Sequence, residues 1–264
     1  MEIKRLISLD AFRGFTIAAM ILVNYPGTWN HVYAPLLHVE WHGITPTDLI
    51  YPFFLYIVGV AIAFSYTRRM ASGAPMKDIY IKLITRSLKI FAVGVFLNLY
   101  PHFNFAEVRI AGVLQRIAIV FLISGFLFLL TSWKTQAITG MVILVAYWLA
   151  MTLIPTPGIG EVMLEPGQNL AAWIDSRFLP GTMWQGTWDP EGILSTFPAV
   201  VTTITGMLTG VFLLSDKTWE RKVIWMFTAG FLFTLAGTVW GGVFPLNKNI
   251  WTSSYVLFTS GLAS

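Results

Sequence analysis

The sequence predicts an all-α fold, a polytopic bundle of transmembrane helices that forms a single domain over residues 1–264. Two observations carry this prediction. Hydrophobic residues make up 56% of the chain and charged residues only 11%, whereas soluble domains carry roughly 25% charged residues. Apolar stretches also recur at about the 20-residue length that a helix needs to cross a bilayer. Most of the surface therefore faces lipid, which excludes an ordinary soluble domain.

Seven stretches have the length and composition of complete spanning helices: residues 8–26, 46–67, 79–100, 109–131, 135–154, 192–214 and 221–241. The first resembles a signal peptide in outline, but Asp10 and Arg13 interrupt it and no small-residue cleavage site follows before Asn24, so we expect a retained helix. An eighth stretch begins near Thr252 and is still apolar at Ser264. That length is too short to cross the hydrocarbon, so we expect a truncated eighth helix and a fragment of something longer.

The basic residues predict the orientation. With a cytoplasmic N-terminus, 13 of the 17 Lys and Arg residues, Lys4 and Arg5 among them, lie on the cytoplasmic side. Only Arg109, Arg177 and Lys248 lie on the other side, and Arg116 falls within a helix. This asymmetry follows the positive-inside rule. We expect an integral membrane protein with a cytoplasmic N-terminus, in a bacterial inner membrane. The absence of cysteine excludes disulfides and thiolate chemistry.

Several sequence motifs occur in a specific order. They are LDAFRG at 9–14 with VNY at 23–25, HVEWHGITPTDL at 38–49 with YPFF at 51–54, RIAGVLQRI at 109–117, DPEG at 189–192 and WTSS at 251–254. In this order and spacing the chain resembles the heparan-α-glucosaminide N-acetyltransferase family and its bacterial relatives, within the transmembrane acyltransferases. The resemblance implies that acetyl-CoA is the co-substrate, that a small amino sugar is the acceptor, and that the acetyl group crosses the membrane. It also implies several further helices after the point where this chain ends.

The resemblance places His38 on the family's catalytic histidine and Asn24 on an active-site asparagine. Imidazole can take a proton from an amine or accept an acyl group itself. An asparagine amide can donate to a thioester oxygen as negative charge develops, although an Asn before Pro26 is also typical of a helix end. Asp48 fits a capping box that begins at Thr45, and it can equally orient a histidine as in triad chemistry.

A second group of residues is predicted to bind the acyl donor. Gln115 and Arg116 lie about two turns inside their helix, where an ionisable group usually faces a cavity or a partner such as Asp48. Arg13 can meet a CoA phosphate or pair locally with Asp10, three residues before it. The remaining members form a basic stripe at i, i+4 and i+7, and this stripe fits either CoA phosphates or anionic lipid: Lys82, Arg86 and Lys89.

His42 and Trp41 are predicted to contact the acceptor sugar. No metal-ligand spacing and no nucleic-acid footprint occurs in the sequence, so we expect neither a metal nor a nucleic-acid partner. A homodimer is compatible with it. The alternative function is transport of an amino sugar or a related solute, because polar intramembrane residues such as Arg116 suit a transporter equally well.

Overall fold

The computed structural model describes residues 6–264, so the predicted cytoplasmic residues Lys4 and Arg5 lie outside the described residues. The helices in chain order are α1 (Ile7–Asn24), α2 (Ile50–Ala71), α3 (Met76–Leu99), α4 (Val113–Leu130), α5 (Trp133–Leu153), α6 (Leu170–Phe178), α7 (Ile193–Leu213), α8 (Trp219–Gly241) and α9 (Ser253–Ala263). Three short 3₁₀ turns precede α2: η1 (Trp29–His31), η2 (Ala34–Leu36) and η3 (Pro46–Leu49).

Each of the seven predicted stretches is a helix, and the all-α prediction is confirmed. Six segments are long and apolar enough to cross a membrane: α1, η3 with α2, α4, α5, α7 and α8. The 24-residue helix α3 has the length, but each of its 18-residue windows carries at least three charged residues. Its crossing therefore stays a prediction, while the other helices make the chain an integral membrane protein. The short helix α6, in the loop 155–191, was not predicted because nine residues give a weak periodic signal.

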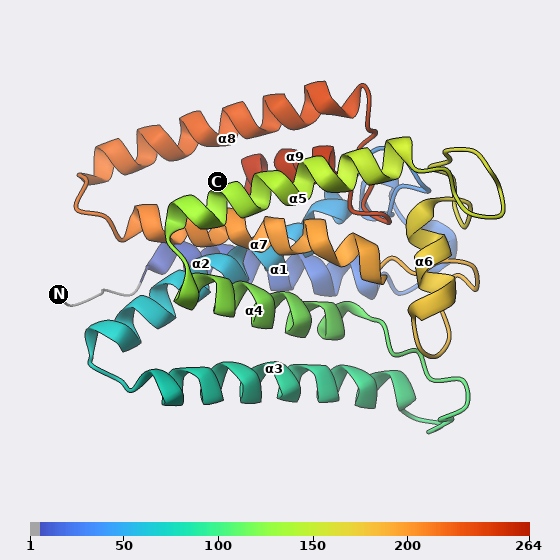
Figure 1. Ribbon diagram of the computed structural model, residues 1–264, viewed down its shortest axis with the longest axis horizontal. Coiled ribbons are helices and arrows are strands. Elements are labelled where there is room, and N and C mark those ends of the chain that lie inside the picture. The colour runs from blue at the N-terminus through green and yellow to red at the C-terminus, as the bar shows by residue number, and fades with distance from the viewer. Residues whose placement is uncertain (1–5) are drawn as a thin grey trace.

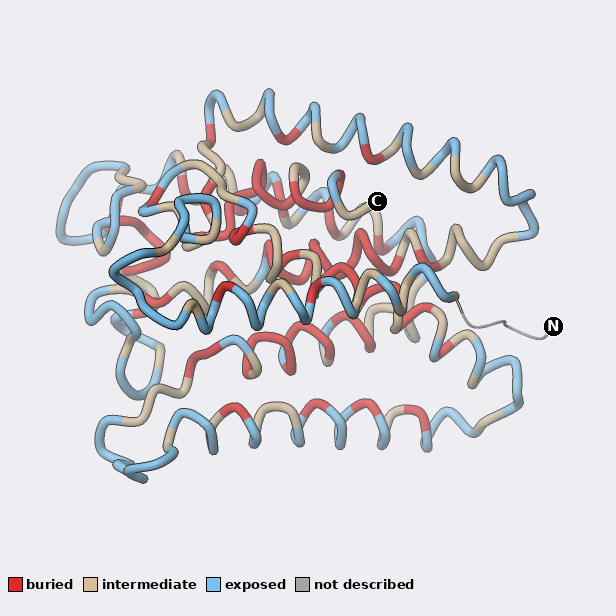
Figure 2. The backbone as a smooth tube through the Cα atoms, turned by 180° about the vertical axis from the view of Figure 1, so that it is seen from behind, coloured by how far each residue is buried: buried red, intermediate tan, exposed pale blue. Residues whose placement is uncertain are grey.

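The helices form a bundle whose central helices are largely buried and whose outer helices are largely exposed (Figures 1 and 2). In its most apolar window α7 is 61% buried, whereas α1 and α8 are each 11% buried. Figure 1 shows α3 along one edge beside α4, and α8 along the opposite edge above α9. The exposed apolar side chains of the outer helices are those expected of surfaces that face lipid tails.

Small residues allow α2 and α7 to pack at close backbone distance. A Cβ added at Gly59 would lie 2.0 Å from the carbonyl oxygen of Thr203, and one added at Gly206 would lie 2.1 Å from that of Tyr56. Gly206 and Gly210 form a GxxxG pattern on α7, which is a common motif where membrane helices approach closely. This contact holds α2, and therefore the turn before it, in a fixed position.

The connecting loops separate into two ends of different chemistry (Figure 1). The short connections α2–α3, α4–α5 and α7–α8 lie at the end where the chain begins, and basic residues lie in them or on the helix ends beside them. The segment 25–49 and the long loops 100–112, 154–192 and 242–252 lie at the opposite end. The predicted charge separation is therefore present in the folded chain.

Candidate functional site: a histidine, an aspartate and a lysine at one end of the bundle

The turn η3 buries the Asp48 carboxylate and holds it by three donors on one oxygen. Asp48 Oδ2 accepts from the Val39 N–H at 3.1 Å, the Thr45 N–H at 3.0 Å and the Thr45 hydroxyl at 3.0 Å. The side chain is 1% exposed. The predicted capping box is thus present, with Thr45 at the N-cap and Pro46 at the first position. Tyr255 of α9 donates to the Asp48 carbonyl at 2.5 Å, which fixes the turn against the centre of the bundle.

The second oxygen of Asp48 is directed at His38. His38 Nδ1 lies 2.7 Å from Asp48 Oδ1, while the His38 side chain remains 54% exposed. The backbone before His38 is held as well, because the Thr45 hydroxyl shares its single hydrogen between Asp48 Oδ2 and the Leu37 carbonyl, which lies 2.7 Å away, and Thr47 donates to the Pro35 carbonyl at 3.2 Å. Asp48 therefore closes the turn and also contacts one imidazole nitrogen of His38 while the ring remains accessible. Its role in catalysis stays a prediction.

A lysine that the sequence reasoning did not assign to the site completes the cluster. Lys248 Nζ lies 2.8 Å from His38 Nδ1, 3.4 Å from His38 Nε2 and 3.3 Å from Asp48 Oδ1. Burial lowers the pKa of the Lys248 ammonium below the usual lysine range, and attraction to Asp48 and to Glu191 offsets only part of this effect. The only available signal in the sequence was that Lys248 is one of three basic residues predicted on the outer side.

The loop between α8 and α9 presents this lysine. Asn247 is fully buried, and its Oδ1 accepts from the Asn249 N–H at 2.7 Å and the Ile250 N–H at 3.1 Å. The Gly43 N–H donates to the Leu246 carbonyl at 2.8 Å, which joins this loop to the histidine segment. Lys248 and His38 are 210 residues apart in the chain, and the hydrogen bonds on both sides of Lys248 hold it next to His38.

Two other predicted residues lie beside the cluster with different exposure. His42 is exposed, and its Nδ1 lies 3.3 Å from Asn247 Nδ2. Because the side chain is exposed, its predicted contact with the acceptor sugar is sterically open and stays a prediction. Trp41 is 9% exposed, donates its indole N–H to the Leu164 carbonyl at 2.9 Å and packs edge-on against Trp188. Trp41 therefore anchors the outer loop, and its predicted contact with a sugar stays a prediction.

Arg116 is buried below the cluster without an acidic partner among the described residues. Its Nη2 donates to the Gly192 carbonyl at 3.1 Å and to the Ser195 hydroxyl, whereas Nε and Nη1 have no hydrogen-bond partner. The guanidinium carbon lies 5.4 Å from the centre of the Trp251 ring. The pairing with Asp48 that the sequence allowed is absent, because Arg116 bonds to the start of α7 instead. Gln115, also buried, has an unpartnered Nε2.

Among the described residues, the remaining predicted ones form no hydrogen bond or ion pair with His38. The Asn24 amide donates to the Met20 carbonyl of its own helix at 2.8 Å and is exposed, as at an ordinary helix end. Arg13 pairs with Asp10 at 3.1 Å. Lys82, Arg86 and Lys89 are all exposed on α3, and the Arg86 guanidinium lies over the Phe121 ring. The stripe runs from the first turns of α3 to just past its middle, and none of its three residues forms a hydrogen bond or ion pair with the His38 cluster in the described part of the chain.

A network of carboxylates holds the outer loops over the bundle. Arg109 donates to both oxygens of Asp189, at 2.7 and 2.6 Å, and to Glu191 at 2.6 Å. Burial alone would raise the pKa of Asp189, but the hydrogen bonds from Arg109 and the backbone outweigh it, so that pKa is lowered. Asp175 accepts from the Ile193 N–H at 2.8 Å, and its burial raises the pKa to about 6.

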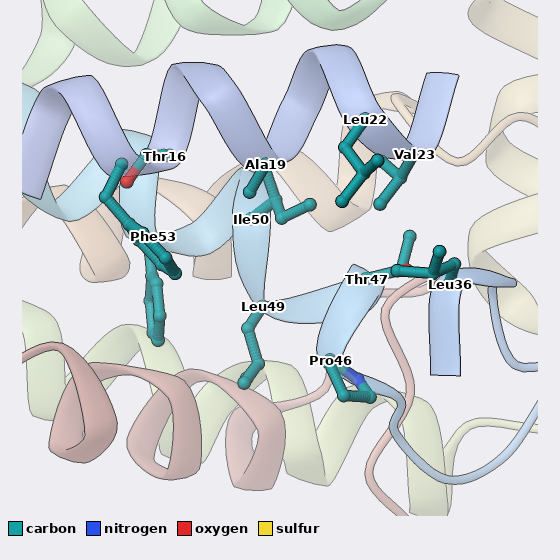
Figure 3. Close-up of a pocket in the computed structure, with 11 residues that line it drawn as sticks. Thr16, Ala19, Leu22, Val23, Leu36, Pro46, Thr47, Leu49, Ile50 and Phe53 are labelled. Carbon is teal, nitrogen blue, oxygen red and sulfur yellow. The ribbon is translucent and has the colours of Figure 1, made fainter. Parts of the chain in front are cut away.

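An apolar cavity of about 310 Å³ lies between α1 and α2 beside η3 (Figure 3). Its wall includes Ala19, Val23 and Phe53 together with Thr47, which directly precedes Asp48. None of the lining residues is charged. The cavity can therefore accept the uncharged part of a ligand next to the turn that holds Asp48, but not a phosphate group.

The fold and this cluster define a class of protein: a helical integral membrane protein with a histidine–carboxylate pair exposed at one end of the bundle. Residues 5–241 match the family described as heparan-alpha-glucosaminide N-acetyltransferase, catalytic, and the chain belongs to this family of acetyltransferases. The heparan-alpha-glucosaminide N-acetyltransferases of Homo sapiens and Mus musculus are similar to it, with 29% and 28% identity over 98% of this chain. The chain spans about half the length of these relatives, 47% and 48% respectively.

Proposed function

We propose that the protein transfers an acetyl group from acetyl-CoA to the amine of an amino sugar, with His38 as the catalytic residue. The observation that carries this proposal is the exposed His38 imidazole held by the buried Asp48 at 2.7 Å. This is the base-and-orienter geometry of acyl-transfer sites. The names of the family and of both relatives support an acetyl donor and a glucosaminide acceptor.

The reaction needs a base, because an amine that attacks a thioester carbonyl becomes a cationic nitrogen and must lose a proton. His38 Nε2 accepts that proton, the carbon–sulfur bond breaks, and the CoA thiolate leaves and is protonated. In the other possible order, His38 Nε2 first takes the acetyl group as an acyl-imidazole and then passes it to the amine. Trapping acetyl-His38 after exposure to acetyl-CoA alone distinguishes the second order from the first.

We infer that acetyl-CoA reaches the site from the cytoplasmic side. The end of the bundle with the basic loops is the cytoplasmic end by the positive-inside rule, in a bacterial inner membrane with the N-terminus inside. The exposed stripe Lys82, Arg86 and Lys89 belongs to that half and matches the phosphates of CoA. The uncharged cavity beside Thr47 suits the acetyl end, and Gln115 and Arg116 carry the unpartnered donors for the thioester or its linker. Arg13 would meet a CoA phosphate in exchange for Asp10, and Asn24 would donate its amide to the thioester oxygen in exchange for the Met20 carbonyl.

The test is transfer of labelled acetyl from acetyl-CoA to glucosamine by the purified protein in proteoliposomes. The His38→Ala variant should lose transfer by roughly 10²- to 10⁴-fold, the usual contribution of a general base. His31→Ala is the matched control, because His31 is also an exposed loop histidine but lies outside the cluster, and it should keep wild-type transfer. Equal activity of both variants, or uptake of an amino sugar without any use of acetyl-CoA, would refute the proposal.

A further inference from the structure

The buried amide of Asn247 has a fixed orientation, and this decides what it offers to His42. Asn247 is fully buried, and its Oδ1 accepts from the Asn249 N–H at 2.7 Å and from the Ile250 N–H at 3.1 Å. If the amide were turned over, its NH₂ group would face two backbone N–H groups, and neither side has a lone pair to accept a hydrogen. The atom that lies 3.3 Å from His42 Nδ1 is therefore the amide nitrogen Nδ2.

This contact sets the tautomer of His42. An amide NH₂ group only donates, so His42 Nδ1 is the acceptor. A ring nitrogen that accepts carries a lone pair, and the hydrogen of the neutral imidazole then sits on the other nitrogen. His42 thus has its hydrogen on Nε2, and the backbone of the loop between α8 and α9 fixes it there through Asn247.

His38, four residues earlier, has the opposite tautomer. Its Nδ1 lies 2.7 Å from Asp48 Oδ1, and an ionised carboxylate only accepts, so the hydrogen sits on Nδ1. The Lys248 ammonium is compatible with this tautomer. Its Nζ lies over the ring, 2.8 Å from Nδ1 and 3.4 Å from Nε2, and 3.3 Å from the same Asp48 oxygen, which can accept from both groups. The lone pair of His38 is therefore on Nε2.

The backbone on both sides of His42 is fixed, whereas its side chain is exposed. Trp41 is nearly buried and donates its indole N–H to the Leu164 carbonyl at 2.9 Å. The Gly43 N–H donates to the Leu246 carbonyl at 2.8 Å, and Gly43 has a positive φ of 109°, so the chain turns directly after His42. The His42 Nε2–H is thus a donor in a fixed place, and it has no hydrogen-bond acceptor among the described residues.

We propose that His42 binds the acceptor: its Nε2–H donates to an oxygen of the amino sugar, while the Nε2 lone pair of His38 takes the proton or the acetyl group. The inference rests on the proposed function for the identity of the ligand. A hydroxyl or ring oxygen accepts such a hydrogen bond, and an amino sugar carries hydroxyl oxygens close to its amine. No bond is made or broken at His42. The two histidines therefore have separate tasks, and His42 is not a second base.

The tautomers can be read without any substrate, so this result stands even if the proposed function is wrong. The chain has four histidines, and nitrogen-15 spectra of histidine-labelled protein in detergent show which ring nitrogen carries the hydrogen. At about pH 8.5, where free imidazole is neutral, we expect the hydrogen on Nδ1 in His38 and on Nε2 in His42. The variants His38→Gln and His42→Gln assign the two signals. A wild-type His42 with its hydrogen on Nδ1 would overturn the proposal.

The change Asn247→Asp makes the spectrum specific to this contact. One carboxylate oxygen keeps the two backbone donors, and the other takes the place of Nδ2 and only accepts. A hydrogen should therefore appear on His42 Nδ1. The His38 signal should stay as in the wild type, which shows that the cluster is intact, and so should the signal of the exposed His31. With both of these unchanged, a His42 signal that does not respond would contradict control by Asn247.

The binding role is tested by acetyl transfer in His42→Phe and His42→Gln. Phenylalanine keeps a ring but has no donor, so the KM for glucosamine should rise about three- to tenfold, while kcat and the KM for acetyl-CoA change by less than about twofold. Glutamine places an NH₂ donor near the position of Nε2–H and should recover most of the loss. An unchanged KM in His42→Phe, or a loss of kcat as large as that of His38→Ala, would overturn the proposal. Absence of transfer by the wild type would refute the proposed function and the sugar contact together, and would leave the tautomers standing.

Discussion

Replacing Asp48 by asparagine should abolish most of the acetyl transfer while leaving the fold in place. Asp48 Oδ2 accepts three donors, from the Val39 backbone and from the backbone and hydroxyl of Thr45. The asparagine oxygen can keep these three bonds. Its NH₂ group then takes the position of Oδ1, 2.7 Å from His38 Nδ1 and 3.3 Å from Lys248, so the Lys248 ammonium loses its acceptor there. An NH₂ group donates, so Nδ1 must accept and the ring hydrogen moves to Nε2.

The magnitude follows from these contacts. A hydrogen bond to a charged group contributes about 1.5–3 kcal/mol, which is a factor of about 10 to 100 in rate if it acts in the transition state. The wrong tautomer adds to this, so we expect a total loss of roughly 10²- to 10⁴-fold in kcat. Stability should also fall, by roughly 3 kcal/mol, because the nearly buried Lys248 ammonium loses its carboxylate partner even though the donors on Oδ2 keep an acceptor.

The assay compares initial rates of labelled acetyl transfer with thermal unfolding in detergent for three proteins. Asp48→Ala is the control for the structural role, since it leaves the Val39 and Thr45 N–H groups without an acceptor at about 1–3 kcal/mol each. We expect Asp48→Asn to unfold below the wild-type temperature, because Lys248 loses its partner, and Asp48→Ala to unfold lower still, because the Val39 and Thr45 N–H groups lose their acceptor as well. Asn activity within threefold of the wild type would refute the orienting role of this carboxylate.

Three further changes test other parts of the structure. Gly206→Ala places a Cβ 2.1 Å from a carbonyl oxygen and should destabilise the protein by about 3 kcal/mol or more. Gly14→Ala is the control, because the space around Gly14 is open, and it should not lower the unfolding temperature. Equal effects of the two changes would contradict the close packing of α2 and α7. In the wild type the native Asp175 carboxyl, with a pKa of about 6, holds its proton more tightly than the unfolded chain does, so stability should fall by about 2 kcal/mol as the pH rises from 4 to 7. Asp175→Asn should flatten that dependence in thermal unfolding, and an unchanged slope would assign it to other groups. The double change Lys82→Gln and Lys89→Gln should raise the KM for acetyl-CoA several-fold with kcat unchanged, and an unaltered KM would leave the stripe to lipid contacts.

The fold was accessible from the sequence because lipid imposes a strong constraint on it. Every spanning segment must satisfy its backbone hydrogen bonds internally, so an apolar run of the right length is a helix. The predicted stretch 192–214 is the helix Ile193–Leu213, for example. The offset at the start of α2 arises because Thr45 caps a 3₁₀ turn before the α-helix begins at Ile50. A 3₁₀ turn this short leaves no periodic pattern of apolar residues in the sequence.

The candidate site was only partly accessible from the sequence. His38 and Asp48 are ten residues apart, so the capping box that places one also constrains the other. Lys248 could not be found in this way, since it reaches His38 only through the packing of α9 and the hydrogen bonds of Asn247. For Arg116 the sequence showed that a buried charge is costly, but its partner was set by where α7 begins. Local patterns predict local pairs, whereas contacts across the bundle depend on tertiary packing.

Two of the three basic residues predicted on the outer side, Arg109 and Lys248, differ in what their contacts allow them to do. Arg109 makes three charge-assisted hydrogen bonds to Asp189 and Glu191, and an arginine cannot release its proton, so this group can only hold the loops. Lys248 shares one carboxylate with an imidazole, is almost buried, and can release its proton. An amino sugar is itself cationic until it loses a proton. A site that deprotonates such a substrate benefits from a cation that can become neutral, and Lys248 is the outer residue whose contacts meet that requirement.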